Sequence, residues 1–241
     1  MKTIIIGGVA GGASAAARLR RLDEKAEIII MERGDFVSFA NCGLPYYIGG
    51  AITEQSKLTL QTPESFRARF NIDVRVNNEV TAIHPTDKTV SVCNTQSGKV
   101  YTENYDRLIL SPGAEPIKPS IPGNDSERVF TLRNIPDTLK IKSFIDSHKP
   151  KSAAVVGGGY IGVEMAENLK NAGLAVTVIE ISDHLIAPLD FDMAADVHGY
   201  LRKNGVKLVL GNGVKEISET NNSLSVALER GSISADMLIM S

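Results

Sequence analysis

The sequence predicts an α/β fold made of two doubly wound units with parallel sheets, accompanied by β-hairpin or meander insertions. An apolar, β-branched run at 3–6 ends in glycines, an alanine-rich helix is expected at 10–22, and a second apolar run follows at 27–31. The same order returns at 153–156, 163–172 and 175–179. Short apolar runs alternating with helical segments are typical of buried parallel strands in βαβ units. The two units are therefore predicted to be Rossmann-like.

The first glycine turn carries Gly7 and Gly12 of a G-x-G-x-x-G pattern, and Glu32 follows the second strand. In such a unit the helix N-terminus offers free N–H groups to a pyrophosphate, and the acidic residue accepts ribose hydroxyls. Val9 occupies the middle glycine position, where the backbone normally approaches the pyrophosphate. The pattern predicts a site for an ADP moiety, with a plain strand-to-helix turn as the alternative.

The second glycine turn is complete. Gly157, Gly159 and Gly162 are all present, and Glu180 lies 18 positions after the last of them. This is the full dinucleotide pattern between a predicted strand and a predicted helix. Glu180 favours a free ribose 2′-hydroxyl and repels a 2′-phosphate, and no arginine directly follows it. We therefore expect NADH as the ligand, with NADPH possible.

The segments between and after these turns complete the predicted fold. Thr62 and Pro63 form a helix start, since threonine is a good N-cap and proline suits the first helical position. Further strands are expected at 73–76, 79–83, 89–94, 99–103, 107–110, 207–210 and 223–229, the last paired with 234–240, and further helices near 43–50, at 136–147 and at 192–204. Three prolines within 115–123 indicate a rigid crossover. We expect domains at 1–115 and 150–241, joined by a crossover and linker helix at 116–149.

Composition excludes several function classes. The net charge is −2 without long blocks of one sign, so neither nucleic acid nor an anionic membrane is an expected partner. No apolar stretch is long enough to span a bilayer. The four histidines are scattered, which argues against a metal site. Two cysteines without a CxxC pair fit a reducing compartment, and we expect a cytoplasmic protein.

Cys42 stands between Asn41 and Gly43, shortly after the second predicted strand. A thiolate is the reactive form of cysteine, and a helix N-terminus or a nearby acceptor ring can hold it ionised. We interpret Cys42 as a redox thiol that works against a flavin, because glycine-rich motifs lie on either side of it. The alternative is a buried structural cysteine, since free cysteines are often buried. Cys93 lies in an alternating strand and is taken to be structural.

Four stretches together resemble a known family. They are IIIGGVAGGASAAARLRRLDEKAEIIIMER, SFANCGLPYYIGG, LILSPGAEP and VVGGGYIGVEMAENL. The chain resembles the flavin-dependent pyridine nucleotide–disulfide oxidoreductases. Within them it is similar to the single-cysteine branch of coenzyme A-disulfide reductases, NADH oxidases and peroxidases, and polysulfide reductases. The resemblance implies that hydride passes from a nicotinamide on the second unit to FAD on the first, and then to Cys42.

The resemblance also assigns cofactor residues. Those implied to hold FAD are Gly7, Val9, Ala10, Gly11, Glu32, Arg33, Val80, Ser111, Pro112 and Gly113. Those implied to hold NADH are Gly157, Gly159, Tyr160, Ile161, Gly162 and Glu180. Tyr160 matches an aromatic that gates the nicotinamide pocket, and Glu164 matches an acid near the reactive edge of the flavin. The alternatives are a packed aromatic and a solvated helix residue.

Coenzyme A is the implied substrate, or partner in a mixed disulfide with Cys42. Arg18, Arg21, Ser38 and Asn41 resemble positions that meet this ligand, although Arg18 and Arg21 equally suit a basic helix surface. An NADH oxidase or peroxidase that uses a cysteine sulfenic acid is an alternative. A redox sensor without turnover is another.

The resemblance finally implies missing parts. A later Gly-Asp segment normally completes the flavin site in this family, and a C-terminal domain normally forms a homodimer. We therefore expect a chain truncated at its C-terminus, which by itself binds FAD weakly and turns over little.

Overall fold

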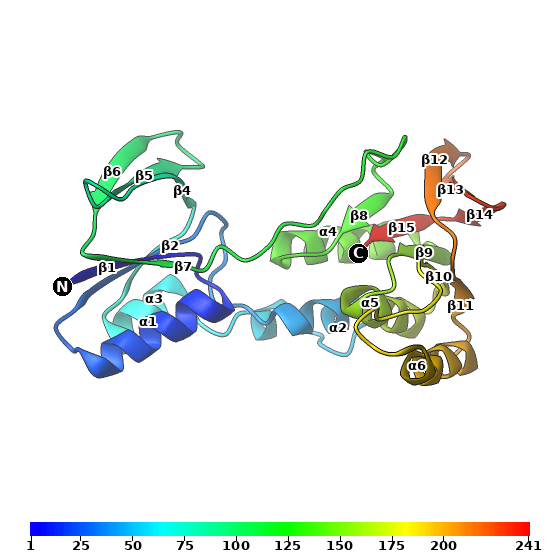
Figure 1. The fold of residues 1–241 in the computed structure, drawn as a ribbon, viewed down its shortest axis with the longest axis horizontal. Coiled ribbons are helices and arrows are strands. Elements are labelled where there is room, and N and C mark those ends of the chain that lie inside the picture. The colour runs from blue at the N-terminus through cyan, green and yellow to red at the C-terminus, as the bar shows by residue number, and fades with distance from the viewer. The chain divides into compact units, whose positions relative to one another are not determined.

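The structure is a computed structural model that describes residues 1–241, and its contacts divide the chain into two compact units (Figure 1). The first unit comprises Met1–Ala40 and Ser56–Ala114, and the second comprises Asn41–Gln55 and Glu115–Ser241. The change of unit after Ala114 lies beside the expected boundary at 115. Residues 41–55, which carry Cys42, instead pack with the second unit.

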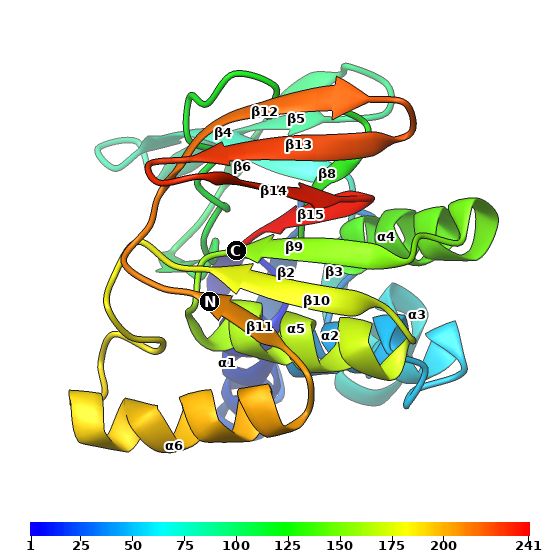
Figure 2. The ribbon, with the colours of Figure 1, turned by 90° about the vertical axis from the view of Figure 1, so that its right-hand side faces the viewer.

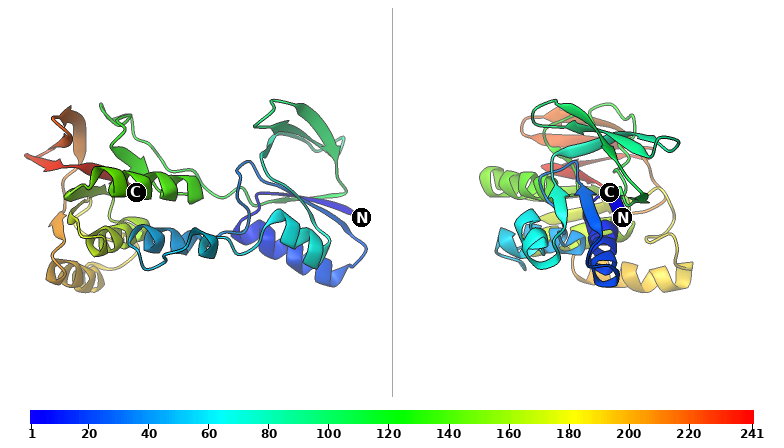
Figure 3. Two further views of the ribbon diagram at one scale, coloured as in Figure 1. Left: turned by 180° about the vertical axis from the view of Figure 1, so that it is seen from behind. Right: turned by 90° about the vertical axis from the view of Figure 1, so that its left-hand side faces the viewer.

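The first unit is built on a parallel sheet in the order β3-β2-β1-β7. These strands are Asp73–Arg75, Glu27–Met31, Lys2–Ile6 and Arg107–Leu110. Helices α1 (Ala10–Leu22) and α3 (Pro63–Phe70) cover one face. An antiparallel sheet of β4 (Asn78–His84), β5 (Thr89–Asn94) and β6 (Val100–Asn104) covers the other face (Figures 1 and 3).

Alternation along the central strands explains these two layers. Ile5, Ile28 and Ile30 pack with the helices, whereas Ile4 and Ile29 pack under the antiparallel sheet. Neighbouring side chains of a strand point to opposite faces, so a strand covered on both faces must be apolar throughout. The continuous isoleucine runs predicted that these strands are buried.

Charged side chains are paired in the first unit. Glu103 accepts hydrogen bonds from the side chains of Lys2 and Arg75. Burial alone would raise the pKa of Glu103, but the hydrogen bonds and charges of its two cationic partners outweigh burial and lower the pKa.

The second unit repeats the same plan on a five-stranded parallel sheet in the order β11-β10-β9-β15-β8, which can be followed in Figure 2. These strands are Lys207–Val209, Ala175–Ile179, Ser152–Val156, Met237–Met240 and Val129–Thr131. The helices are α2 (Leu44–Ile48), α4 (Ile135–His148), α5 (Tyr160–Asn171) and α6 (Phe191–Lys203). The antiparallel sheet is formed by β12 (Val214–Thr220), β13 (Ser223–Leu228) and β14 (Ser232–Ala235).

The internal repeat extends to single hydrogen bonds. Ser111 N–H donates to the Ile6 carbonyl at 2.8 Å, and Ser241 N–H donates to the Val156 carbonyl at 2.9 Å. Each bond ties the residue after the last parallel strand to the end of the first strand of its unit. The sheet of the second unit differs by one additional strand, β8, beside β15.

One expectation about this unit is wrong. The predicted strand at 234–240 is two strands, and only β14 pairs with β13, while β15 enters the parallel sheet. Asp236 separates them, because its Oδ2 accepts the N–H groups of Lys151 and Ser152 at 2.7 and 3.0 Å. All four residues of β15 are buried, as expected for a central parallel strand.

The region 116–149 includes a strand and a helix of the second unit. It contains β8, which pairs with β15, and α4, which contacts β8 and α2. Ile135 and Ile141 of α4 are fully buried, so this helix belongs to the core of the second unit. No helix of the chain is both long enough and apolar enough to cross a membrane.

Candidate nucleotide sites and redox cysteine

The first glycine turn is held by backbone contacts that only glycine permits. Gly7 has φ +92°, and a Cβ there would lie 2.0 Å from the Ser111 carbonyl oxygen. A Cβ on Gly12 would lie 1.8 Å from the Gly7 carbonyl oxygen. Both distances are far below a van der Waals contact, so α1 packs against β1 without side chains between them. Helix α1 starts with no side-chain cap at Val9, which leaves its first N–H groups for a ligand.

Glu32 is held in place by the same turn. Its Oε2 accepts the Gly8 N–H at 2.8 Å and its Oε1 accepts the Gly34 N–H at 3.0 Å. A carboxylate oxygen has two acceptor positions, so each oxygen retains one for a ribose hydroxyl. The turn and the carboxylate together fit the ADP part of FAD.

The second turn has the same construction. A Cβ on Gly157 (φ +104°) would lie 2.2 Å from the Ser241 carbonyl oxygen, and one on Gly162 would lie 2.1 Å from the Gly157 carbonyl oxygen. Gly159 faces open space and caps α5 without a side-chain bond. This open position corresponds to Val9 in the first turn, which explains why valine is tolerated there.

Glu180 repeats the bonds of Glu32. Its Oε2 accepts the Gly158 N–H at 2.6 Å, and its Oε1 accepts the Ser182 N–H at 2.8 Å. In the first turn of α5, Tyr160 is 62% exposed and does not pack into the core, and Ile161 is exposed as well. Glu164 lies one helical turn further on and is half-buried.

Cys42 is exposed, so it is not the buried structural cysteine of the alternative interpretation. It lies in a short 3-10 turn, Asn41–Gly43, directly before α2. Leu44 and Ile48 anchor α2, since both are almost fully buried and α2 contacts α4 and α5. The thiol therefore stands at the surface of the second unit, directly before a helix that is firmly packed. Cys93 is half-buried in β5.

The implied substrate residues are divided between the units, with Asn41 beside the cysteine and the others in the first unit. Arg18 and Arg21 are exposed on α1 and have no hydrogen bond or ion pair, whereas Arg20 is bonded to the carbonyl oxygens of Phe70 and Asn71. Ser38 is buried and adopts φ +48°, a conformation that is uncommon outside glycine.

The remaining implied flavin residues lie in the first unit. Ala10 and Gly11 are exposed at the start of α1, and Arg33 is exposed directly after Glu32. Val80 is half-buried in β4, and Pro112 and Gly113 follow β7 as exposed residues.

Sequence reasoning missed the segment between β10 and α6. Leu185 N–H donates to Nε2 of His198 at 3.0 Å, and Ile186 N–H donates to the Gly158 carbonyl at 2.8 Å. Burial lowers the pKa of His198, and the charges of Arg202 and His184 lower it further. The sequence gives no sign of this contact, because His198 and Leu185 are 13 positions apart in different elements.

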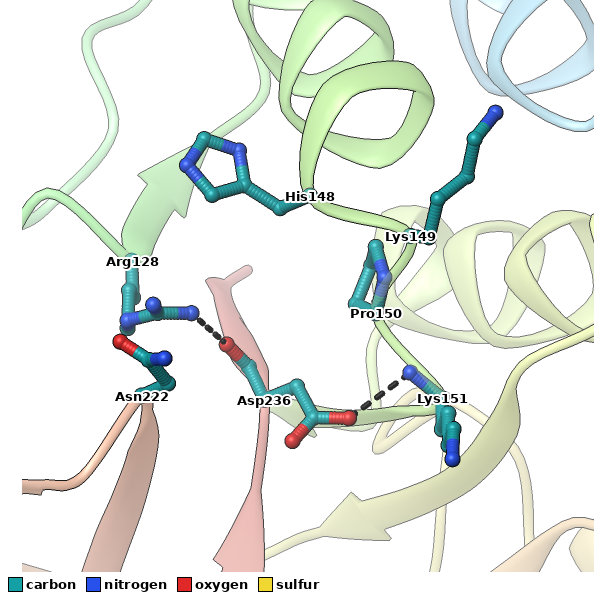
Figure 4. A pocket seen from close by; sticks show the side chains of 7 residues that line it. All are labelled: Arg128, His148, Lys149, Pro150, Lys151, Asn222 and Asp236. Atoms are coloured by element: carbon teal, nitrogen blue, oxygen red, sulfur yellow. Dashed lines mark hydrogen bonds between the residues drawn. The ribbon is translucent and has the colours of Figure 1, made fainter.

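A pocket of about 540 Å³ lies at the other end of β9, away from Gly157 (Figure 4). Its lining residues are Arg128, His148, Lys149, Pro150, Lys151, Asn222 and Asp236. The side chains of Lys149 and Lys151 extend in opposite directions, so the cations do not converge on one point. This pocket is separate from the glycine turn.

Comparison with known proteins agrees with the geometry. A profile of the family described as pyridine nucleotide-disulphide oxidoreductase matches residues 1–241. Coenzyme A disulfide reductase from Staphylococcus haemolyticus is 46% identical over 192 residues, which cover 80% of this chain and 43% of that protein. The protein of the same name from Staphylococcus aureus NCTC 8325 is 40% identical, with 90% and 49% covered. The chain thus spans less than half the length of these relatives.

Solved structures show the same relationship. Reduced Bacillus anthracis CoADR-RHD has a TM-score of 0.96 and 52% identity, covering 100% of this chain and 43% of that one. The NAD-dependent persulfide reductase from A. fulgidus has a TM-score of 0.94 and 36% identity, covering 100% and 45%. The water-forming NADH oxidase from Lactobacillus brevis, bound to NADH, has a TM-score of 0.91 and 32% identity, covering 99% and 53%. With two glycine turns of this construction and a family match along its whole length, the chain belongs to the pyridine nucleotide-disulphide oxidoreductases, a family that uses FAD and NAD(P)H.

Proposed function

We propose that this chain forms the FAD- and NADH-binding part of an oxidoreductase that reduces coenzyme A disulfide or a related small disulfide or persulfide. The observation that carries the proposal is the exposed Cys42 in a chain with two glycine turns, each closed by a carboxylate. Relatives named coenzyme A disulfide reductase, at 40 and 46% identity, support this substrate class.

The first unit is the proposed flavin site. Gly7 and Gly12 bring β1 and α1 together, and the N–H groups at the start of α1 face the pyrophosphate. Glu32 accepts the ribose hydroxyls with the acceptor positions that its backbone bonds leave free. When bound, FAD supplies the electron pair that returns an oxidised cysteine to the thiol.

The second unit is the proposed NADH site. Glu180 presents its carboxylate to a ribose 2′-hydroxyl and repels a 2′-phosphate, which favours NADH over NADPH. Tyr160 is exposed at the start of α5, as a side chain that covers a bound nicotinamide has to be. Glu164, half-buried on the same helix, is the proposed acid near the reactive edge of the flavin.

Cys42 is the proposed nucleophile. Its thiolate attacks one sulfur of coenzyme A disulfide, the S–S bond breaks, and one coenzyme A thiolate leaves. The product is a mixed disulfide between Cys42 and the second coenzyme A. Reduction of that bond by two electrons, with a proton, releases the second thiol and restores Cys42.

The proposed binding residues for coenzyme A are Arg18, Arg21, Ser38 and Asn41. Arg18 and Arg21 are exposed and unpaired, and guanidinium groups bind phosphates through charge-assisted hydrogen bonds. We also propose a cytoplasmic location, because both cysteines are free thiols and such thiols suit a reducing compartment. The homodimer proposed for the full-length protein rests on the resemblance to the family.

The test compares the full-length protein with its Cys42→Ser and Cys93→Ser variants. NADH-dependent release of thiol from coenzyme A disulfide should be abolished in Cys42→Ser and kept in Cys93→Ser. Mass spectrometry of the purified protein should find coenzyme A attached at Cys42. Added oxygen atoms at Cys42, with oxygen consumption faster than disulfide reduction, would favour an NADH oxidase. The similarity to the water-forming NADH oxidase from Lactobacillus brevis supports this as the second candidate function. Failure to oxidise NADH with every acceptor would favour a redox sensor.

A further inference from the structure

We propose that His198 is a positioning residue for the nucleotide site of the second unit. Only its neutral imidazole holds in place the segment between β10 and α6, residues 180–190. Nucleotide binding should therefore weaken as the medium becomes acidic. The inference rests on the proposed function in one respect, that the second unit binds NADH.

The contact between His198 and the segment is buried. Leu185 is fully buried, His198 is 4% exposed, and Leu185 N–H donates to Nε2 of His198 at 3.0 Å. An N–H group that loses its acceptor inside the protein is left without a hydrogen bond and without water, which destabilises the state in which it is buried. This bond therefore fixes the middle of the segment to α6.

The segment does not hold this shape through its local sequence. Ile186 adopts φ +53°, an outlier for a β-branched residue, which persists only when the surroundings impose it. Two contacts do so: Leu185 N–H on His198, and Ile186 N–H on the Gly158 carbonyl. Loss of the first leaves Ile186 with its bond to Gly158 and a local bond from Leu189 N–H to its own carbonyl at 2.8 Å, and removes the tie between the segment and α6.

The segment is also part of the nucleotide site. A Cβ on Gly158 would lie 2.3 Å from Cδ2 of Leu185, so the leucine packs directly on the glycine turn. Gly158 N–H and Ser182 N–H both donate to the Glu180 carboxylate, at 2.6 and 2.8 Å. A displacement of Leu185 therefore disturbs the turn and the carboxylate that are proposed to hold the ribose.

The protonation state follows from the bond. Nε2 accepts a hydrogen bond, so it carries no proton and the ring is neutral with its proton on Nδ1. Protonation of Nε2 would place an N–H group of the ring opposite the N–H group of Leu185, so two donors would face each other and the hydrogen bond would be lost. The charged groups that face the ring are Arg202, one turn further along α6, and His184 in the segment.

These neighbours set the direction of the pH effect. Asp183 hydrogen bonds to His184 and raises the pKa of His184, so a positive charge is kept near His198. Burial, Arg202 and His184 all lower the pKa of His198. The closed segment is therefore fully favoured above about pH 6.5 and loses stability as the pH falls toward the lowered value.

The first measurement is amide hydrogen exchange at Leu185 in the full-length protein. After correction for the intrinsic exchange rate, its protection should fall by up to about tenfold per pH unit below about pH 6.5. The dissociation constant for NADH, measured by titration of nicotinamide fluorescence, should rise over the same range. Protection that does not change with pH would overturn the inference.

Two variants separate positioning from a structural role. The amide of His198→Gln can place an uncharged acceptor near the position of Nε2, so protection should remain and become independent of pH. The shorter His198→Asn cannot reach Leu185, so protection should be low at every pH. Equal behaviour of both variants, or a native pH slope in His198→Gln, would overturn the inference. If NADH binds at no pH, the proposed function fails, while the exchange measurement still tests His198.

Discussion

Gly49 packs α2, the helix that directly follows Cys42, against α5, and its replacement by alanine tests that packing. Gly49 caps α2 with φ −71° and ψ −11°, which alanine also adopts, so no backbone strain enters. A Cβ there would lie 2.5 Å from Oδ1 of Asn168 on α5. Asn168 is 1% exposed and its Nδ2 donates to the Glu164 carbonyl at 2.9 Å, which prevents it from turning aside.

The magnitude follows from two opposing effects. An extra methyl group in a packed contact costs about 1–3 kcal/mol. Replacing glycine by alanine in a helical conformation raises the free energy of unfolding by roughly 1 kcal/mol. We expect Gly49→Ala to lower the free energy of unfolding of the second unit by up to about 2 kcal/mol, and the melting temperature by up to roughly 8 °C.

The assay is thermal unfolding with amide exchange at Ile52, whose N–H donates to the Tyr46 carbonyl at 3.1 Å. Gly199→Ala is the matched control, because Gly199 lies within α6 of the same unit and its Cβ would meet nothing within 4 Å. That variant should gain about 0.5–1 kcal/mol. The reasoning is refuted if Gly49→Ala stabilises the protein as Gly199→Ala does. Adding Asn168→Ala to Gly49→Ala should recover part of the loss.

Three further predictions concern the two turns and the charged network. Gly12→Ala should lower the free energy of unfolding by about 3 kcal/mol or more, and Gly11→Ala by less than about 1 kcal/mol. A Cβ on Gly11 would meet only the Ser111 side chain, with Oγ at 3.4 Å and Cβ at 3.6 Å, and chemical denaturation compares the two variants. Glu180→Gln should raise the dissociation constant for NADH about tenfold and reduce the preference of the protein for NADH over NADPH. Both carboxylate oxygens of Glu180 accept backbone N–H groups, so the amide NH2 of glutamine must face one of these donors. Titrations with both nucleotides measure the two effects. Glu103→Gln should lower stability by about 1–2 kcal/mol at neutral pH. Because the folded state lowers the pKa of Glu103, this difference is present above about pH 4.5 and should disappear as the pH falls through the lowered value, which unfolding curves across acid pH would show.

The elements with strong local patterns could be predicted from the sequence. Helix α1 and strand β2 lie at Ala10–Leu22 and Glu27–Met31, as expected from 10–22 and 27–31. Strands covered on both faces must be apolar throughout, and the glycines mark where they end. The N-cap at Thr62 is confirmed as well, with a capping box formed with Ser65.

The elements that could not be predicted depend on distant contacts. The break at Asp236 arises because its carboxylate binds the backbone at Lys151 and Ser152, more than 80 positions earlier. The apolar run after it looks like a continuation of the preceding strand until those contacts are known. Short β8 and solvent-facing β12 offered too weak a pattern.

Dependence on distant contacts also limits how much of the candidate site can be predicted. The motif glycines and carboxylates were found because their chemistry needs fixed spacings, and the structure places each of them at a turn of the expected kind. The packing of α2 with the second unit depends on the meeting of Gly49 with Asn168, which no local pattern encodes. The acceptor role of His198 is hidden for the same reason.

The repetition of one turn has a consequence for ligand choice. Both carboxylates bind equivalent backbone positions, so this shared frame cannot distinguish a flavin from a nicotinamide cofactor. The side chains at the start of the two helices do differ, since Ala10 and Gly11 are small whereas Tyr160 and Ile161 are bulky and exposed. Under the proposed function, one backbone scaffold therefore serves two recognition tasks, and residues outside the shared frame distinguish them.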